Sequence, residues 1–259
     1  MFQIGLCSVT FRNLSVEEII EAAKNTDIQG IEWGGDIHVP PGDLEHAAYA
    51  ANITRQAEID IISYGSYYRL GVKEQPFSFE AILDTAEKLT APAIRVWAGN
   101  IGSSEATERQ WEKVIEDAKR IADLAEKQGI HINLEYHGRT LTDTADSAIR
   151  LMKKINHSNV SLYWQPSPFE TVNKNVKSID TVRQWLSHVH VFHWQLVENN
   201  VIVYPFSAGI SDWEKYLQQL EKQQGMCYLM MEFVKEDSIE QLKNDVKVLQ
   251  SIITSYSAK

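Results

Sequence analysis

Short runs of apolar and β-branched residues recur along the chain at intervals of about 30 residues, the spacing of βα units. Each run has the length of a strand, and longer segments with apolar residues at helical spacing lie between the runs. Such alternation is typical of parallel strands joined by crossover helices. We expect eight strands, over residues 2–10, 30–33, 61–64, 94–98, 130–136, 161–164, 188–194 and 228–234.

Amphipathic segments lie between these strands, and four of them begin with a serine that is followed by acidic residues. A serine hydroxyl at this place accepts a hydrogen bond from a free N–H of the first turn, and the acids favour the positive end of the helix dipole. Gly129 and Gly225 follow two segments, where helices commonly end. We expect helices over residues 15–26, 78–89, 105–128, 211–224 and 238–251, with Ser15, Ser78, Ser211 and Ser238 as caps.

The repeated strand and helix pattern predicts one (β/α)8 barrel over residues 1–259, with its active site at the carboxyl ends of the strands. No polar linker interrupts the order. An open, doubly wound sheet is the alternative fold, but a dinucleotide-binding sheet of that kind normally carries GxGxxG after an early strand, and the sequence has no such motif. The connection over residues 195–209 is long, and we expect it to act as a lid.

The composition is that of a soluble globular protein, with 44% hydrophobic and 23% charged residues. A formal net charge of -10 disfavours nucleic acid as a partner. We find no run long enough to span a bilayer and no signal peptide, so we expect a cytoplasmic protein with a small-molecule partner; a homo-oligomer stays open. Cys7 and Cys227 fall at different heights on neighbouring strands, which predicts free thiols.

Polar residues close the later apolar runs, at the rim where a barrel carries its chemistry. Glu135 ends the fifth run, Gln165 follows the sixth, His190 lies in the seventh and Glu232 ends the eighth. A buried carboxylate is costly unless it is paired or bound to a metal ion. Two carboxylates and an imidazole at one rim are suited to Mn²⁺, Mg²⁺, Co²⁺ or Zn²⁺.

The ordered set resembles the xylose isomerase-like barrel family, which contains ketose 3-epimerases, hydroxypyruvate isomerase, inosose dehydratase and endonuclease IV. That family places Glu after strand five, Asp in a Trp-Asp-Pro-like turn after strand six, His in a His-Val-His run and Glu in a final Glu-Phe or Glu-Pro. The resemblance implies Glu135, His190 and Glu232 as ligands of a divalent metal ion. Gln165 stands where the family has Asp, and its amide oxygen can coordinate a cation without adding charge, so we expect weaker metal binding.

The resemblance implies an isomerase or epimerase of a small sugar, a sugar phosphate or a related α-hydroxycarbonyl compound. The reaction would pass through an enediolate, with Glu135 and Glu232 as bases. A polyol dehydratase is one alternative. A metal-poor carbohydrate-binding barrel without turnover is another, suggested by Gln165 and by Pro168 and Leu196, which stand where ketose epimerases carry a substrate-binding His and Arg. DNA repair, as in endonuclease IV, is least favoured because it needs more metal ligands and a cationic groove.

Other polar residues near the strand ends are candidates for substrate binding. Glu32 and Arg95 either line a sugar site or form an internal salt bridge. His38 lies in a proline-rich loop, and His193 is a candidate substrate contact or extra ligand. His137 shares the strand parity of the glutamate two residues earlier, so we expect it to reach the same cavity. Aromatic residues at strand ends either pack the barrel or line a sugar site: Trp33, Tyr64, Tyr67, Tyr68, Trp97 and Trp164.

Overall fold

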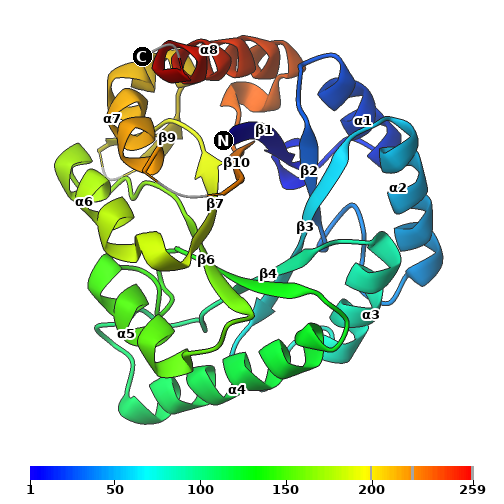
Figure 1. Ribbon diagram of the computed structural model, residues 1–259, viewed down its shortest axis with the longest axis vertical. Helices are drawn as coiled ribbons and strands as arrows, with labels where there is room; N and C mark the ends of the chain where they lie inside the picture. The colour runs from blue at the N-terminus through cyan, green and yellow to red at the C-terminus, as the bar shows by residue number, and fades with distance from the viewer. Residues whose placement is uncertain (199, 223–224, 258–259) are drawn as a thin grey trace.

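The computed structural model describes residues 1–198, 200–222 and 225–257. Within these residues, eight parallel strands close into a barrel and eight helices surround it (Figure 1). The order around the barrel is β1-β10-β7-β6-β5-β4-β3-β2, so the last barrel strand lies beside the first. The predicted fold class, a (β/α)8 barrel, is confirmed.

The barrel strands are β1 (Phe2–Cys7), β2 (Gly30–Gly34), β3 (Asp60–Arg69), β4 (Ala93–Trp97), β5 (His131–Glu135), β6 (Val160–Trp164), β7 (Leu186–Val191) and β10 (Cys227–Met231). The helices are α1 (Val16–Lys24), α2 (Leu44–Gln56), α3 (Phe79–Leu89), α4 (Glu108–Glu126), α5 (Ala145–Ile155), α6 (Val172–Val182), α7 (Ile210–Leu220) and α8 (Ile239–Ser257). Short 3-10 helices are η1 (Ser8–Phe11), η2 (Arg183–Trp185), η3 (Phe206–Gly209) and η4 (Lys235–Asp237).

The helix starts follow the capping chemistry of the sequence in most places. Ser15 and Ser78 cap α1 and α3, and the Ser238 hydroxyl accepts a bond from the third residue of α8. The predicted start of α4 at residue 105 is wrong, because Thr107 forms the capping box. Ser211 is also wrong as a cap. It lies inside α7, which begins one residue earlier without a side-chain cap.

The predicted strand over residues 188–194 is too long, because β7 ends at Val191. Part of the predicted lid, together with Trp194, instead forms an antiparallel hairpin of β8 (Trp194–Val197) and β9 (Asn200–Val203). Apolar and β-branched residues on both sides of a short polar turn favour such a hairpin. The segment therefore has secondary structure of its own, and its movement as a lid stays a prediction.

Strand β3 runs beyond its predicted end at residue 64 and reaches Arg69 at the carboxyl rim. Its register against β4 shifts between Gly65 and Arg69, which indicates an irregularity of the bulge type. Tyr67, inside this stretch, has a φ of 58°, a backbone conformation that is uncommon for a bulky side chain. The irregular stretch carries aromatic and basic residues to the mouth of the barrel.

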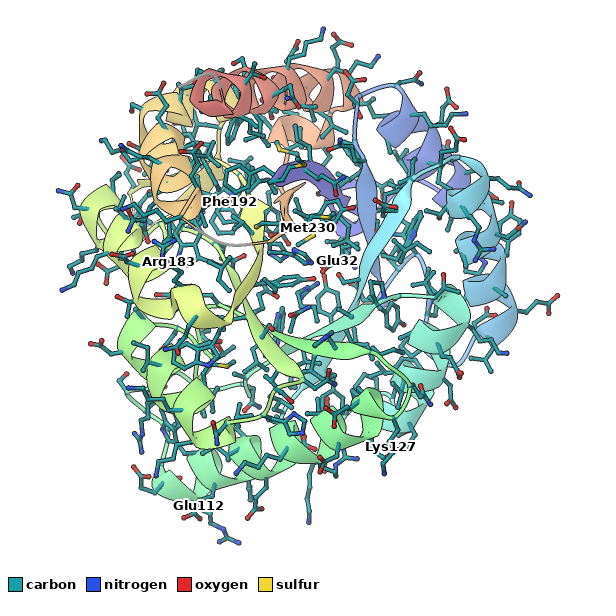
Figure 2. All side chains as sticks on the ribbon, viewed as in Figure 1. Glu32, Glu112, Lys127, Arg183, Phe192 and Met230 are labelled. Atoms are coloured by element: carbon teal, nitrogen blue, oxygen red, sulfur yellow. The ribbon has the colours of Figure 1, made fainter. Side chains whose placement is uncertain are left out.

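Side chains sort between the barrel interior and the outer surface (Figure 2). Glu32 and Met230 lie toward the centre of the barrel and are buried. Glu112, on α4, and Lys127, just after the end of α4, face outward. Cys7 and Cys227 are buried free thiols, as predicted. Cys227 lies opposite Phe2 at the start of β1, whereas Cys7 is the last residue of β1, so the two thiols lie at different heights in the barrel. No helix among the described residues is long and apolar enough to cross a membrane.

Gly30 tests how tightly the barrel interior is packed. A Cβ atom there would lie 2.7 Å from Ile62 Cγ1 and 3.0 Å from Tyr228 Cε1. We expect Gly30→Ala to lower the free energy of unfolding by about 1–3 kcal/mol through overpacking, measured by urea denaturation. The control is Gly138→Ala, at an exposed loop position with nothing within 4 Å, which should change it by less than about 0.5 kcal/mol. Equal stability of the two variants would contradict the tight packing.

Candidate active site

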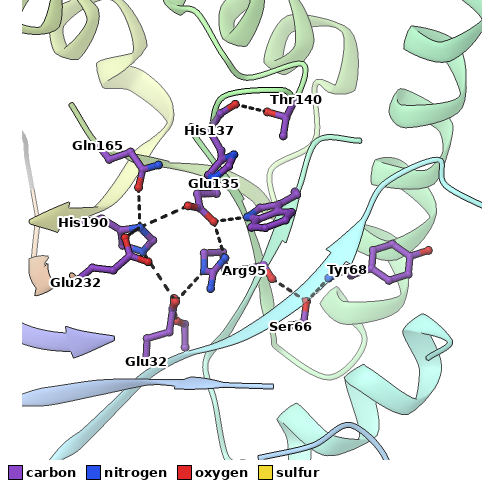
Figure 3. A network of polar contacts seen from close by, with 12 residues as sticks. Glu32, Ser66, Tyr68, Arg95, Glu135, His137, Thr140, Gln165, His190 and Glu232 are labelled. Atoms are coloured by element: carbon purple, nitrogen blue, oxygen red, sulfur yellow. Dashed lines mark hydrogen bonds and ion pairs between the residues drawn. The ribbon is translucent and has the colours of Figure 1, made fainter. Parts of the chain in front are cut away.

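The four side chains predicted to bind a metal ion come from four strands that are neighbours in the barrel. Glu135 ends β5, Gln165 follows β6, His190 lies in β7 and Glu232 follows β10. All four are buried, with exposed fractions of 0 to 8%. Their polar ends point toward one another (Figure 3). The structure therefore brings this predicted set together at one rim.

Three oxygens face one nitrogen in this cluster. His190 Nδ1 lies 2.9 Å from Gln165 Oε1, 3.2 Å from Glu232 Oε2 and 3.7 Å from Glu135 Oε1. A ring nitrogen carries at most one proton and so cannot donate to all three oxygens. Glu232 Oε2 is buried without a hydrogen-bond partner. Atoms bound to one divalent ion at about 2.0–2.2 Å lie roughly 3 to 3.5 Å apart, and the Gln165 and Glu232 oxygens lie at about such distances from Nδ1. The Glu135 oxygen lies farther away, and among the described residues Glu135, His190 and Glu232 do not form a group whose ligand atoms all lie within 4.8 Å of one another, so the two carboxylates would have to draw together around an ion.

The other side of the imidazole fits a cation less well. The ligand atoms of Cys7, Glu32 and His190 lie within 4.8 Å of one another, and His190 Nε2 has no hydrogen-bond partner. Burial raises the pKa of the Cys7 thiol to about 12, so the thiol keeps its proton at neutral pH. Glu32 already accepts bonds from Arg95 and Ser63. The oxygen-rich Nδ1 side is therefore the better metal site.

Arg95 lies beneath the cluster between two carboxylates (Figure 3). Its Nε lies 2.8 Å from Glu32 Oε1 and its Nη1 lies 2.5 Å from Glu135 Oε2. All three groups are almost fully buried. Of the two alternatives left open by the sequence for Glu32 and Arg95, the structure contains the internal salt bridge, and no free oxygen of Glu32 is turned to a substrate.

The charges of this network decide the ionisation of Glu135. Burial by itself would raise its pKa, but Arg95 and then His190 lower it, to about 2 overall. Burial would raise the pKa of Glu32 as well, but Arg95, His190 and the hydrogen bond from Ser63 together lower it. Three buried carboxyl groups, the third being Glu232, face one guanidinium. Burial by itself would lower the pKa of His190, but Glu232 raises it well above its usual value, so a proton on the imidazole supplies positive charge beside Arg95. A divalent cation at Nδ1 would take the place of that proton.

Trp97 and His137 line the rim above this network. Trp97 Nε1 donates a hydrogen bond to Glu135 Oε2, and the His137 ring stacks on the indole with centroids 4.8 Å apart. His137 Nδ1 lies 2.6 Å from the carbonyl oxygen of Gly138. A carbonyl oxygen only accepts, so Nδ1 carries the proton and Nε2 keeps a free lone pair in the neutral ring.

A cavity of about 580 Å³ opens beside His137. Gln165 lines this cavity, so the cavity reaches the cluster around His190. Its apolar walls are formed by Phe169, from the loop after β6, and by Trp194 and Val201, from the hairpin. This volume suits a small organic molecule. The predicted placement of His137 at the cavity of the metal cluster agrees with this geometry.

Two histidines proposed as substrate contacts lie elsewhere. His38 is buried, with Nδ1 3.0 Å from Ser8 Oγ and Nε2 3.1 Å from the Leu14 carbonyl, so both ring nitrogens are bonded within the protein. His193 and Asp212 line a smaller cavity of about 100 Å³, which shares Pro168 and Trp194 with the cavity beside His137. Burial lowers the pKa of His193. Neither histidine joins the cluster around His190.

Sequence reasoning placed Trp97 either in the barrel packing or in the wall of a sugar site and gave it no polar role, yet its indole N–H donates a hydrogen bond to a carboxylate of the site. The signal was present: Trp97 lies two residues after Arg95 on one strand, so both side chains project to the same face. Arg69 and Tyr67 depend on the irregularity in β3 and could not be placed from periodicity.

Comparison with known proteins places this architecture in a family. A sequence profile of the xylose isomerase-like TIM barrel matches residues 20–252, and the chain belongs to this family. It is similar to a 3-dehydroshikimate dehydratase from Bacillus anthracis, with 23% identity over 95% of both chains.

Three solved structures share the fold. The probable 3-DHS dehydratase AsbF from Bacillus anthracis has a TM-score of 0.78 and 20% identity, over 96% of this chain and 98% of that one. The IolI protein with a zinc atom has a TM-score of 0.70 and 13% identity, over 98% and 97%. A D-psicose 3-epimerase with D-tagatose, from Clostridium cellulolyticum H10, has a TM-score of 0.66 and 16% identity, over 97% and 91%.

Removal of Arg95 should expose the cost of the buried charges. We expect Arg95→Met to lower the free energy of unfolding by about 3–5 kcal/mol, because two buried carboxylates lose their partner. Arg150→Met is the matched control: its ion pair with Glu108 is exposed and should contribute less than about 1 kcal/mol. Urea denaturation with a chelator present measures the free energy of unfolding of both variants. A loss for Arg95→Met as small as that for Arg150→Met would refute the stabilising role of the Glu32–Arg95–Glu135 salt bridges.

Proposed function

We propose that the chain is a divalent-metal-dependent enzyme that removes a proton from the carbon beside the carbonyl group of a small hydroxylated compound. The observation that carries this proposal is the convergence of Glu135, Gln165 and Glu232 on His190 Nδ1. A divalent cation held there would stabilise the negative charge that develops on the carbonyl oxygen. The zinc atom in the IolI structure supports a metal ion in this fold.

His137 is the base that we assign to proton removal. Its Nε2 lone pair is free, and it lines the cavity with Gln165, where a substrate would meet it. Glu135, with a pKa of about 2, is a much weaker base. We therefore assign Glu135 to metal binding alone, which departs from the pair of glutamate bases expected from the sequence.

The groups beneath the cluster are positioning residues. Arg95 and Trp97 both bond Glu135 Oε2, which leaves Oε1 turned to His190. Glu32, which accepts a hydrogen bond from the Ser63 hydroxyl, in turn fixes Arg95 from the far side. Outer partners of this kind set the orientation of metal ligands in many sites. Glu32 and Arg95 would thus act on the ligands and not on the substrate.

Loss of water is the outcome that we favour after proton removal. The C–H electron pair forms a C=C bond, the hydroxyl on the next carbon leaves with its electrons, and a proton completes the water molecule. The similarity to a 3-dehydroshikimate dehydratase along 95% of both chains supports this outcome. So do Pro168 and Leu196, which replace the substrate-binding side chains of ketose epimerases.

Return of the proton, as in an isomerase or epimerase of a sugar, is the second candidate. The unpartnered Glu232 Oε2 favours it, because Glu232 follows a strand separated from β5 by β6 and β7 and offers a second base from another direction. In both cases we infer one catalytic domain acting on a small molecule. A barrel that binds carbohydrate without turnover is the outcome left if no metal ion binds.

Metal binding tests the cluster directly. We expect one Mn²⁺, Co²⁺ or Zn²⁺ per chain by elemental analysis, with a rise in Tm. Gln165→Asp adds a charge and should tighten binding about tenfold or more in calorimetry, whereas His190→Ala should abolish it. The control is His131→Ala, an exposed residue at the opposite end of β5. Absence of an ion in the wild-type protein would end the proposal.

Turnover tests the base. We expect metal-loaded protein to dehydrate 3-dehydroshikimate, or to exchange a C–H proton of a ketose with solvent deuterium. His137→Gln should lower kcat by about 10²–10⁴-fold while metal affinity stays unchanged, because His137 is assigned to proton transfer and not to metal binding. Absorbance of the aromatic product and NMR of exchange give the rates. A wild-type rate in His137→Gln would remove the histidine as the base.

A further inference from the structure

Arg69 is the last residue of β3 and lies at the carboxyl rim of the barrel, on the side of the metal cluster. Its guanidinium carbon lies 3.8 Å from the centroid of the Trp97 ring. Trp97 in turn donates its N–H to Glu135. A single indole therefore separates this cation from a proposed metal ligand.

The guanidinium of Arg69 keeps most of its donors unused. Its Nη1 lies 3.3 Å from the Gly99 carbonyl oxygen, and in the part of the chain that the structure describes no carboxylate lies within ion-pair distance of it. The side chain is half-buried. Five other arginines pair with carboxylates: Arg12, Arg95, Arg120, Arg150 and Arg183.

The backbone around Arg69 is shaped to hold it in place. Its N–H donates to Gln75 Oε1 at 2.8 Å. Tyr67, two residues earlier, has a φ of 58° and packs edge-on against Trp97, with ring centroids 5.3 Å apart. A left-handed backbone at a bulky residue is strained and tends to persist where a site needs it.

We propose that Arg69, held flat on Trp97, binds the carboxylate of an acidic substrate whose carbonyl end lies at the cluster of Glu135 and His190. This inference rests on the proposed function and names the substrate class, a small hydroxyketo acid in place of a neutral sugar. The planar fork of a guanidinium matches a carboxylate with two parallel hydrogen bonds. A single guanidinium balances the single charge of a carboxylate.

The charge of the whole chain makes such a cation necessary. A formal net charge of -10 repels anions from most of the surface, so an acidic substrate needs a local positive group at the mouth. Arg139, which also forms no ion pair within the described part of the chain, lines the 580 Å³ cavity beside His137. Two arginines at one rim supply that local field, and Arg69 is the one held in a fixed orientation.

The test compares two probes that differ in one charge. Calorimetry on Mn²⁺-loaded protein is performed with 3,4-dihydroxybenzoate, which has adjacent oxygens for the metal ion and a carboxylate, and with its methyl ester. We expect the acid to bind at least about tenfold more tightly than the ester. In Arg69→Gln this ratio should fall to about one while the affinity for the ester stays unchanged, and Arg69→Lys should keep part of the ratio.

Arg55→Gln, at the last turn of α2, is the control and should keep the full ratio. Equal binding of acid and ester to the wild-type protein, or a full ratio in Arg69→Gln, would overturn the carboxylate site while the metal cluster stands. Failure of both probes to bind metal-loaded protein would count against the proposed function as well. If inorganic phosphate displaces the acid but not the ester, the carboxylate assignment would be overturned in favour of a phosphate group.

Discussion

The salt bridges of Arg95 to Glu32 and Glu135 are the interaction on which the rest of the site depends. They join β2, β4 and β5 inside the barrel, at a depth where an unpaired charge would be very costly. Breaking one side leaves a buried carboxylate alone, so the three side chains hold one another in a single arrangement. That arrangement turns the second oxygen of Glu135 toward His190 and fixes where a cation can be bound.

The same network explains why the glutamates of the site are not equivalent. The carboxylate of Glu135 accepts bonds from Arg95 and Trp97, which lower its pKa and remove its capacity as a base. Glu232 has an oxygen without a partner, and His137 has a free ring nitrogen above the cavity. In the proposed mechanism, metal binding and proton transfer would thus fall to different side chains, which suits a reaction whose first step is proton removal beside a carbonyl group.

The fold could be predicted from periodicity because a barrel repeats one local pattern and its strand ends fall at one rim. The same regularity placed Glu135, Gln165 and His190 together. It failed where the backbone departs from the pattern: the hairpin after β7, and the irregular end of β3 that carries Arg69 to the mouth. His38 shows the other limit, since a polar residue in a loop gives no sign that both its ring nitrogens are bonded to the protein.

Gln165 becomes understandable once Arg95 is counted. The buried carboxyl groups of Glu32, Glu135 and Glu232 already outnumber the single guanidinium of Arg95, and an aspartate in place of Gln165 would add one more acidic group to the buried site. A neutral site repels an anionic substrate less than a negative one does, and it accommodates the charge that develops on a carbonyl oxygen. On the proposed function, the amide would weaken the hold on a metal ion but favour an acidic substrate, in line with the proposed role of Arg69 at the same rim.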